Sequence, residues 1–194
     1  METTTKEKAF FRRREPLQTM LLIALTSIGI TFFILLFIYF VKTGGFGGRL
    51  PLLFWFSTLA IGLSSFTLYQ AQKCIKTDKF DWYRVYIWAT LVFGLLFLLF
   101  QVLAWQTMWG RGTRLDNSLS GAFVYVISGL HFLHVLVGII LLVKTVIQAQ
   151  IYRDYVDAYI FHINPPNQLK IKLLSIYWHF VGVLWLVLFL ILLV

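Results

Sequence analysis

Three histidines inside apolar segments are the residues of this chain best suited to chemistry. His131 and His134 are three positions apart, so they share one face of a helix, with Ser128 one turn before them and Gly138 one turn after. His179 lies in a later apolar segment. Neutral imidazole is a common ligand, so a small membrane haem protein that uses His131 and His179 is one interpretation. Hydrogen bonding between helices is the other, and we favour it because no carboxylate accompanies the histidines.

Small and aromatic residues recur at helical spacing around these histidines. Small side chains beside Ser, Gln and His allow helix backbones to approach closely and to hydrogen-bond across the interface. We therefore predict a structural or lipid-packing role for Ser128, His131, His134, Gly138, Trp178, His179, Gly182, Trp185, Gln101 and Trp105. The three histidines are expected to find neutral partners, namely hydroxyl groups, the Gln101 amide, backbone carbonyls or each other.

Other chemistries lack the residues that they need. The single cysteine, Cys74, excludes an internal disulfide and any metal site built on several cysteines. Proton relays in membranes use chains of Asp, Glu or His, and the apolar segments contain no carboxylate. A transporter with a charged coupling site and a metal site built on several cysteines are therefore not expected.

Five uncharged stretches must position these side chains. Of the 194 residues, 59% are hydrophobic and only 13% are charged, about half the usual share of a soluble domain. Each stretch is long enough to cross about 30 Å of hydrocarbon. We predict an all-α polytopic membrane protein, a single bundle of five transmembrane helices at about 20–41, 51–72, 85–109, 118–143 and 173–194, after a tail at 1–19.

The basic residues predict the orientation of the bundle. Of the 17 Lys and Arg, 13 fall on the side of the N-terminal tail and four on the other side. The positive-inside rule then places the N-terminus in the cytoplasm and the C-terminus outside. The net charge of +9 is explained by topology and needs no nucleic acid.

The longest loop lies between the last two spans and is rich in aromatic residues. Tyr152, Tyr155 and Tyr159 suggest either a docking surface or anchoring of a helix end at the membrane interface, and we favour anchoring. The sequence Asn164-Pro165-Pro166-Asn167 is expected to break any helix.

Two motifs resemble subunit III of the haem-copper oxidases, in its five-helix bacterial form. Tyr177-Trp178-His179-Phe180-Val181 with Trp185 is similar to the family pattern Tyr-Trp-His-Phe-Val-Asp-x-x-Trp. Ser128-Gly129-Leu130-His131-Phe132-Leu133-His134-Val135 is similar to Thr-Gly-Phe-His-Gly-Leu-His-Val. Weaker matches are Ser64-Ser65-Phe66-Thr67 and Gln101-x-x-x-Trp105.

The resemblance implies a role in a respiratory complex. It implies an accessory subunit without haem or copper that packs on the catalytic subunit I and holds phospholipid in grooves. The whole complex, with haem and copper in its catalytic subunits, would pass electrons from cytochrome c to oxygen in the bacterial plasma membrane. A quinol oxidase subunit III or a homologue associated with nitric oxide reductase is the alternative within the family.

Three carboxylates of the family pattern are missing from this chain. Ile28 follows Ser27 where the family usually has Glu, Ala104 precedes Trp105 where a second Glu is common, and Gly182 replaces the Asp of the last motif. A proton-handling role that depends on these carboxylates is therefore not expected.

Overall fold

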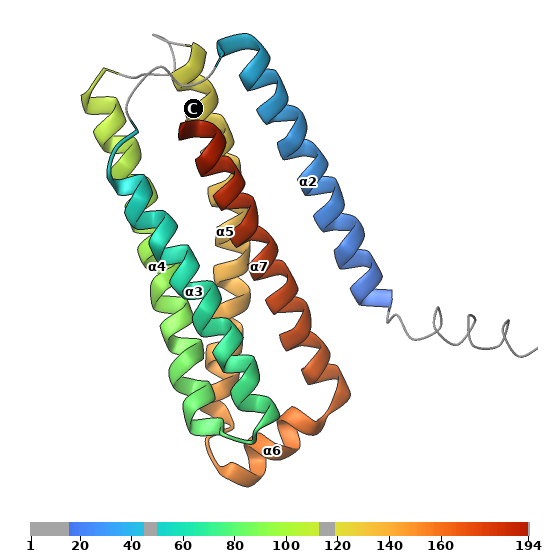
Figure 1. Ribbon diagram of the computed structural model, residues 1–194. Helices are drawn as coiled ribbons and strands as arrows, with labels where there is room; N and C mark the ends of the chain where they lie inside the picture. Colours follow the sequence, from blue (N-terminus) through green and yellow to red (C-terminus); the bar gives the residue numbers. More distant parts are fainter. Residues whose placement is uncertain (1–15, 45–49, 113–118, 194) are drawn as a thin grey trace, which may run out of the picture.

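The helices lie side by side in one elongated bundle, with a short helix across one end. The computed structural model describes residues 16–44, 50–112 and 119–193 (Figure 1). Its helices are α2 (Pro16–Thr43), α3 (Leu53–Lys76), α4 (Phe80–Gly110), α5 (Leu119–Ile151), α6 (Tyr155–Ile163) and α7 (Pro165–Leu193). Within these described residues, the expectation of an all-α fold is confirmed.

Four of these helices are long and apolar enough to cross a membrane, by length and composition. They are α2, α4, α5 and α7. The segment expected to be the second span forms α3, but α3 is not among these four. Its buried face carries Ser57, Ser64 and Thr67, and these hydroxyl groups lower the hydropathy of the segment.

Each long helix extends beyond its predicted span. α4 begins at Phe80 instead of residue 85, and α5 continues to Ile151 instead of ending at 143. The predicted spans ended at charged residues. In the structure, Arg84 lies within α4 and Lys144 within α5, each near one end of its helix. α7 differs most, because it begins at Pro165 and not at 173. Proline is well placed in a first helical turn, where no N–H is required. Of the predicted break at Asn164-Pro165-Pro166-Asn167, only Asn164 lies outside a helix, and the other three residues form the first turn of α7.

The tightest pairing joins α3 and α4, which form an antiparallel hairpin. Asp78 lies in the short turn between them with φ 54, in the left-handed region that Asp tolerates better than most residues. The backbone N–H groups of Thr77 and Lys79 both donate to the Cys74 carbonyl at 3.2 and 3.0 Å, which closes the end of α3.

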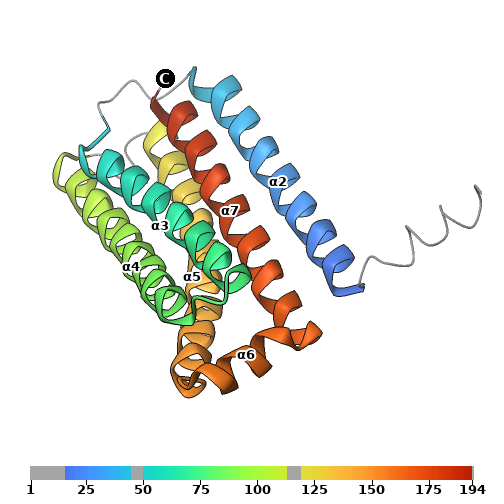
Figure 2. The same ribbon diagram turned by 60° about the horizontal axis from the view of Figure 1, so that its bottom comes forward.

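α7 is the central helix and α2 is peripheral. Figures 1 and 2 show α7 between α3 and α2, with α5 behind, and α6 lies across the end where α5 turns into α7. Trp178 and Trp185 of α7 are completely buried. In α2 only Leu25, Phe32, Leu36 and Tyr39 are buried, and most other apolar side chains of that helix are exposed.

Candidate functional site

The indole ring of Trp178 occupies the centre of the bundle. It lies between two glycines, Gly94 of α4 and Gly138 of α5. A Cβ atom added to Gly138 would lie 2.8 Å from Cζ3 of Trp178, and one added to Gly94 would lie 3.0 Å from Cη2. The indole N–H donates to Oγ of Ser64 on α3 at 3.1 Å. One side chain of α7 therefore contacts three other helices, and the two glycines provide the space for it.

Two further tryptophans donate hydrogen bonds to hydroxyl groups on neighbouring helices. Nε1 of Trp185 donates to Oγ1 of Thr58 at 3.0 Å, which joins α7 to α3. Nε1 of Trp105 donates to Oγ of Ser128 at 3.0 Å, which joins α4 to α5. Bonds of this kind satisfy polar groups internally, as a hydrocarbon environment requires.

The hairpin of α3 and α4 has its own hydroxyl and amide contacts. Nε2 of Gln101 donates to Oγ of Ser57 at 3.0 Å, and Ser64 donates to the Thr90 carbonyl at 3.0 Å. The hydroxyls of Thr67 and Thr90 are 2.9 Å apart. The contact of Thr67 with Thr90 was missed by the sequence reasoning. The signal available was the spacing of Ser57, Ser64 and Thr67, which lie on one face of α3.

The histidines behave differently from the prediction. His134 does bond to a neutral group, since its Nδ1 lies 2.7 Å from the Leu130 carbonyl, while its own carbonyl accepts the hydroxyl of Tyr177 at 2.7 Å. The prediction is wrong for His131, because both of its ring nitrogens are buried without a hydrogen-bond partner among the described residues. His179 is half-buried, and within the described part of the chain no side-chain hydrogen bond of its ring is found, so its expected neutral partner stays a prediction.

Aromatic rings enclose His131. The centroid of its imidazole lies 5.2 Å from Trp185, 5.8 Å from Phe97 and 6.3 Å from Phe32. His179 is not among its ring contacts in the described residues. These aromatic side chains occupy the space around the imidazole that a haem iron bound to His131 would need. Among the described residues, no three His, Cys, Asp or Glu side chains lie where they could hold a metal ion.

The three positions without the family carboxylates lie in or against the packed interior. Ala104 is completely buried, and Ile28 is half-buried against the core. Gly182 is buried next to α3, and a Cβ atom at this position would lie 3.0 Å from Oγ of Ser65. An ionised group at Ala104 or Gly182 would lose its hydration and would need a partner, and the present side chains make no such demand.

Two apolar grooves follow the contact between α2 and α7. The first, of 530 Å³, is lined by Leu22, Gly29 and Phe33 of α2 and by Ile176 and Phe180 of α7, among others. The second, of 470 Å³, shares Gly29 and Phe33 with the first and continues along α7 towards Ile191. The two grooves therefore follow one another along the long axis of the bundle.

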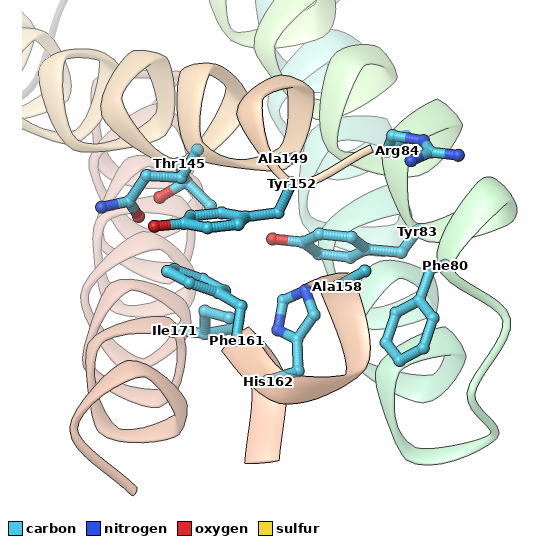
Figure 3. Close-up of a pocket in the computed structure, with 11 residues that line it drawn as sticks. Phe80, Tyr83, Arg84, Thr145, Ala149, Tyr152, Ala158, Phe161, His162 and Ile171 are labelled. Carbon is cyan, nitrogen blue, oxygen red and sulfur yellow. The ribbon is translucent and has the colours of Figure 1, made fainter. Parts of the chain in front are cut away.

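The aromatic loop residues cover the end of the bundle that carries α6. Figure 3 shows Phe80 and Tyr83 of α4 facing His162 of α6. The rings of Phe80 and His162 are stacked at 5.4 Å, and Tyr152 stacks on Phe161 at 4.4 Å. Burial lowers the pKa of His162, because the charged imidazolium would lose its hydration. The sequence reasoning did not connect this loop with Phe80 and Tyr83, which come from a different span.

Known proteins resemble this chain over most of its length. Residues 47–194 match the family described as "Cytochrome c oxidase subunit III". "Cytochrome c oxidase subunit 3" of Thermostichus vulcanus is 35% identical over 133 residues, which cover 69% of this chain and 61% of that protein. "Probable cytochrome c oxidase subunit 3" of Mycobacterium tuberculosis (strain ATCC 25618 / H37Rv) is 29% identical over 133 residues, or 68% of this chain and 61% of that protein.

A similar protein with a different name covers more of the sequence. "Probable quinol oxidase subunit 3" of Staphylococcus epidermidis is 28% identical over 155 residues, or 75% of this chain and 71% of that protein. This chain therefore spans between about 61% and 71% of the length of these curated relatives. Because the family match covers well over half of the residues, the chain belongs to the cytochrome c oxidase subunit III family.

Proposed function

We propose that this chain is the accessory subunit III of a respiratory haem-copper terminal oxidase and contains no active site of its own. In this role it packs on the catalytic subunit I and holds phospholipid in its grooves. The complex as a whole transfers electrons from cytochrome c to oxygen, through haem and copper carried by the catalytic subunits. The observation that carries the proposal is the family match over residues 47–194.

The distribution of side chains supports a packing role. The buried polar side chains of Ser64 and Gln101 form hydrogen bonds that join neighbouring helices. The imidazole of His131 packs against aromatic rings. Large apolar side chains cover the outside, for example Phe33 with 70% of its surface exposed. Such a surface suits lipid or another membrane subunit and does not suit water.

We further propose that α3 is the fifth transmembrane helix of one bundle. Its 24 residues would extend about 36 Å at 1.5 Å per residue, enough to cross the hydrocarbon core. Its hydroxyl groups lie on the buried face, whereas Leu59, Leu63 and Phe66 are exposed. With five spans, the basic residues favour a cytoplasmic N-terminus, an external C-terminus and a place in the bacterial plasma membrane.

Gentle purification of the full chain tests the proposal. A tagged chain is extracted from its native membrane in mild detergent, and the absorption spectrum and subunit composition of the product are recorded. A haem-bearing oxidase subunit is expected to co-purify in constant ratio. Purification of the chain alone from membranes that contain active oxidase would refute the proposal.

A second measurement separates the proposal from a haem-binding role. After dissociation of the complex, the isolated chain is expected to show no Soret band. A Soret band that disappears in the His131→Ala variant would show instead that this chain itself binds haem.

The second candidate is subunit III of a quinol oxidase. It is favoured by the Staphylococcus epidermidis relative, whose alignment covers the larger share of this chain. The purified complex can be assayed with reduced cytochrome c and with a ubiquinol or menaquinol analogue as electron donors. Oxygen consumption with quinol alone would select the second candidate.

A further inference from the structure

Two polar side chains, His179 of α7 and Ser65 of α3, lie where these helices meet at the surface of the bundle. Figures 1 and 2 show α3 and α7 side by side, with α5 behind them. Both side chains are half-buried, so each of them reaches the surface. Gly182 follows His179 by one helical turn, and a Cβ atom at Gly182 would lie 3.0 Å from Oγ of Ser65. His179 and Ser65, here called the polar pair, therefore belong to one small area of the surface.

The hydrogen-bonding capacity of the polar pair is not used inside the described part of the chain. No side-chain hydrogen bond of the His179 ring or of the Ser65 hydroxyl is found there. Other polar side chains at the surface are satisfied by their own helix. The hydroxyl groups of Thr31 and Thr145, for example, each donate to the carbonyl four residues earlier at 2.9 Å. The polar pair therefore has donors and acceptors to offer to another molecule.

The polar pair lies well inside the apolar part of both helices. His179 is seven residues, or about 10 Å along the helix axis, from Lys172, the last charged residue of α7. Ser65 is eight residues, or about 12 Å, from Lys73 of α3. Lysine side chains reach to the level of the headgroups, so in the proposed bundle the polar pair lies in hydrocarbon. Water is absent there, and a polar group without a partner costs free energy.

The surface around the polar pair is apolar and is shallow next to Ser65. Val183 and Leu186 follow His179 by one and two turns and are 59% and 43% exposed. Gly62, one turn before Ser65, is exposed, and apart from its chain neighbours and its own helix backbone no atom lies within 4 Å of a Cβ at this position. Contacts between transmembrane helices combine such features, because small residues permit close approach and polar side chains hydrogen-bond across the interface.

We infer that this face of α3 and α7 binds a transmembrane helix of another subunit, which presents the side-chain amide of Asn or Gln to the polar pair. The inference rests on the proposed function and deepens it, because it assigns one contact by which this chain packs in its complex. His179 and Ser65 form the centre of the contact, and the apolar side chains of Val183 and Leu186 lie beside it.

An amide on another chain matches the polar pair better than the other occupants of a membrane do. A neutral imidazole and a serine hydroxyl each have a donor and an acceptor, and an amide has both as well. Acyl chains have neither, and a carboxylate would bring an ionic charge into hydrocarbon. A second copy of this chain offers no suitable amide, because those of the described helices lie within two turns of a helix end. The exception is Gln101, which is buried and bound to Ser57.

Photo-cross-linking in the native membrane tests the inference. The tagged full-length chain carries p-benzoylphenylalanine in place of Val183, one turn from His179. After irradiation, mass spectrometry identifies the attached peptide. It is expected to come from a transmembrane segment of another subunit that contains Asn or Gln. The same reagent in place of Val137 of α5, which is 50% exposed, is the control and is not expected to yield this segment.

Variants distinguish a contact between subunits from one within the chain. Fluorescence energy transfer measures the dissociation constant between the labelled full-length chain and the rest of the purified complex. His179→Leu and Ser65→Ala are each expected to raise it by about three-fold, and by at most roughly eighteen-fold, as measured for hydrogen bonds between transmembrane helices. His179→Gln keeps a donor and an acceptor and is expected to retain most of the affinity. His131→Leu, at a position enclosed by aromatic rings, is the matched control and should leave the dissociation constant unchanged. The isolated His179→Leu chain is expected to unfold at the temperature of the parent.

Four results would overturn the inference. They are a cross-link from position 183 only to lipid or to a second copy of this chain, a cross-linked segment without Asn or Gln, an unchanged dissociation constant in His179→Leu, and a lower unfolding temperature of the isolated His179→Leu chain, which would indicate a bond within the chain. Each of them is compatible with co-purification of the parent chain and a haem-bearing subunit. Failure of this contact can therefore be distinguished from failure of the proposed function.

Discussion

Substitution of Gly138 by alanine should place a methyl group against the indole of Trp178. The new Cβ would lie 2.8 and 2.9 Å from Cζ3 and Cε3 of that ring, and 3.3 Å from Cε1 of Tyr177. Ordinary contacts of carbon atoms begin at about 3.5 Å, so the ring must move by roughly half an ångström. It cannot move freely, because it is completely buried and its N–H is bound to Ser64. Overpacking of this kind costs about 1–3 kcal/mol.

The measurement is the free energy of unfolding in mixed micelles, followed by intrinsic tryptophan fluorescence and by loss of helical circular dichroism. Gly129→Ala in the same helix is the matched control, because, apart from its chain neighbours and its own helix backbone, no atom lies within 4 Å of a Cβ at this position. The control variant should be as stable as the parent, or more stable by up to about 1 kcal/mol, since alanine favours helix.

A double-mutant cycle separates the contact with Trp178 from other effects of the methyl group. Trp178→Phe is expected to be destabilising by itself, but in this background Gly138→Ala should cost about 1 kcal/mol less than in the parent. If Gly138→Ala and Gly129→Ala have the same stability, or if the cycle shows no coupling, the central role assigned to the Trp178 contact is refuted.

Three further predictions concern single polar side chains. Ser64→Ala removes the acceptor of the Trp178 indole and should lower the free energy of unfolding by about 1 kcal/mol; an unchanged value would show that this hydrogen bond contributes nothing. His131→Leu removes two buried nitrogens without partners and should keep or raise the thermal stability by up to about 1 kcal/mol, whereas a clear loss would reveal a missed interaction. Because burial lowers the pKa of His162 from 6.5, the unfolded chain takes up a proton first, and stability should fall as the pH drops below about 6.5, by at most about 1.4 kcal/mol per pH unit. Thermal unfolding at pH 7.5 and 5.5 checks this, and His162→Phe should show a smaller difference than the parent.

The existence of the long helices could be predicted because apolar length is a property of each segment by itself. Their ends could not, since the predictions treated charged residues such as Lys144 as stops, although a long helix can carry them at the level of the headgroups. Pro165 was interpreted as a breaker, and it is also the first residue of α7.

The packing residues could be predicted in kind but not in their pairings. The spacing of Trp178 and Gly138 indicated close helix contacts, but it did not reveal that the indole lies against both Gly138 and Gly94. Periodicity places a side chain on a face of a helix, and only the assembled bundle decides what lies opposite that face. For the same reason the expectation for His131 was wrong, because its neighbours are rings and not hydroxyls.

The neutrality of the packed interior has an electrical consequence. In the part of the chain that the structure describes, no Asp, Glu, Lys or Arg side chain is buried, and the helices are joined by indole, hydroxyl and amide groups. A voltage across a membrane changes the energy of an elementary charge that crosses it by about 2.3 kcal/mol per 100 mV. Contacts without such charges are not strained or relaxed by that field. The buried contacts between these helices therefore offer a membrane voltage no full charge on which to act.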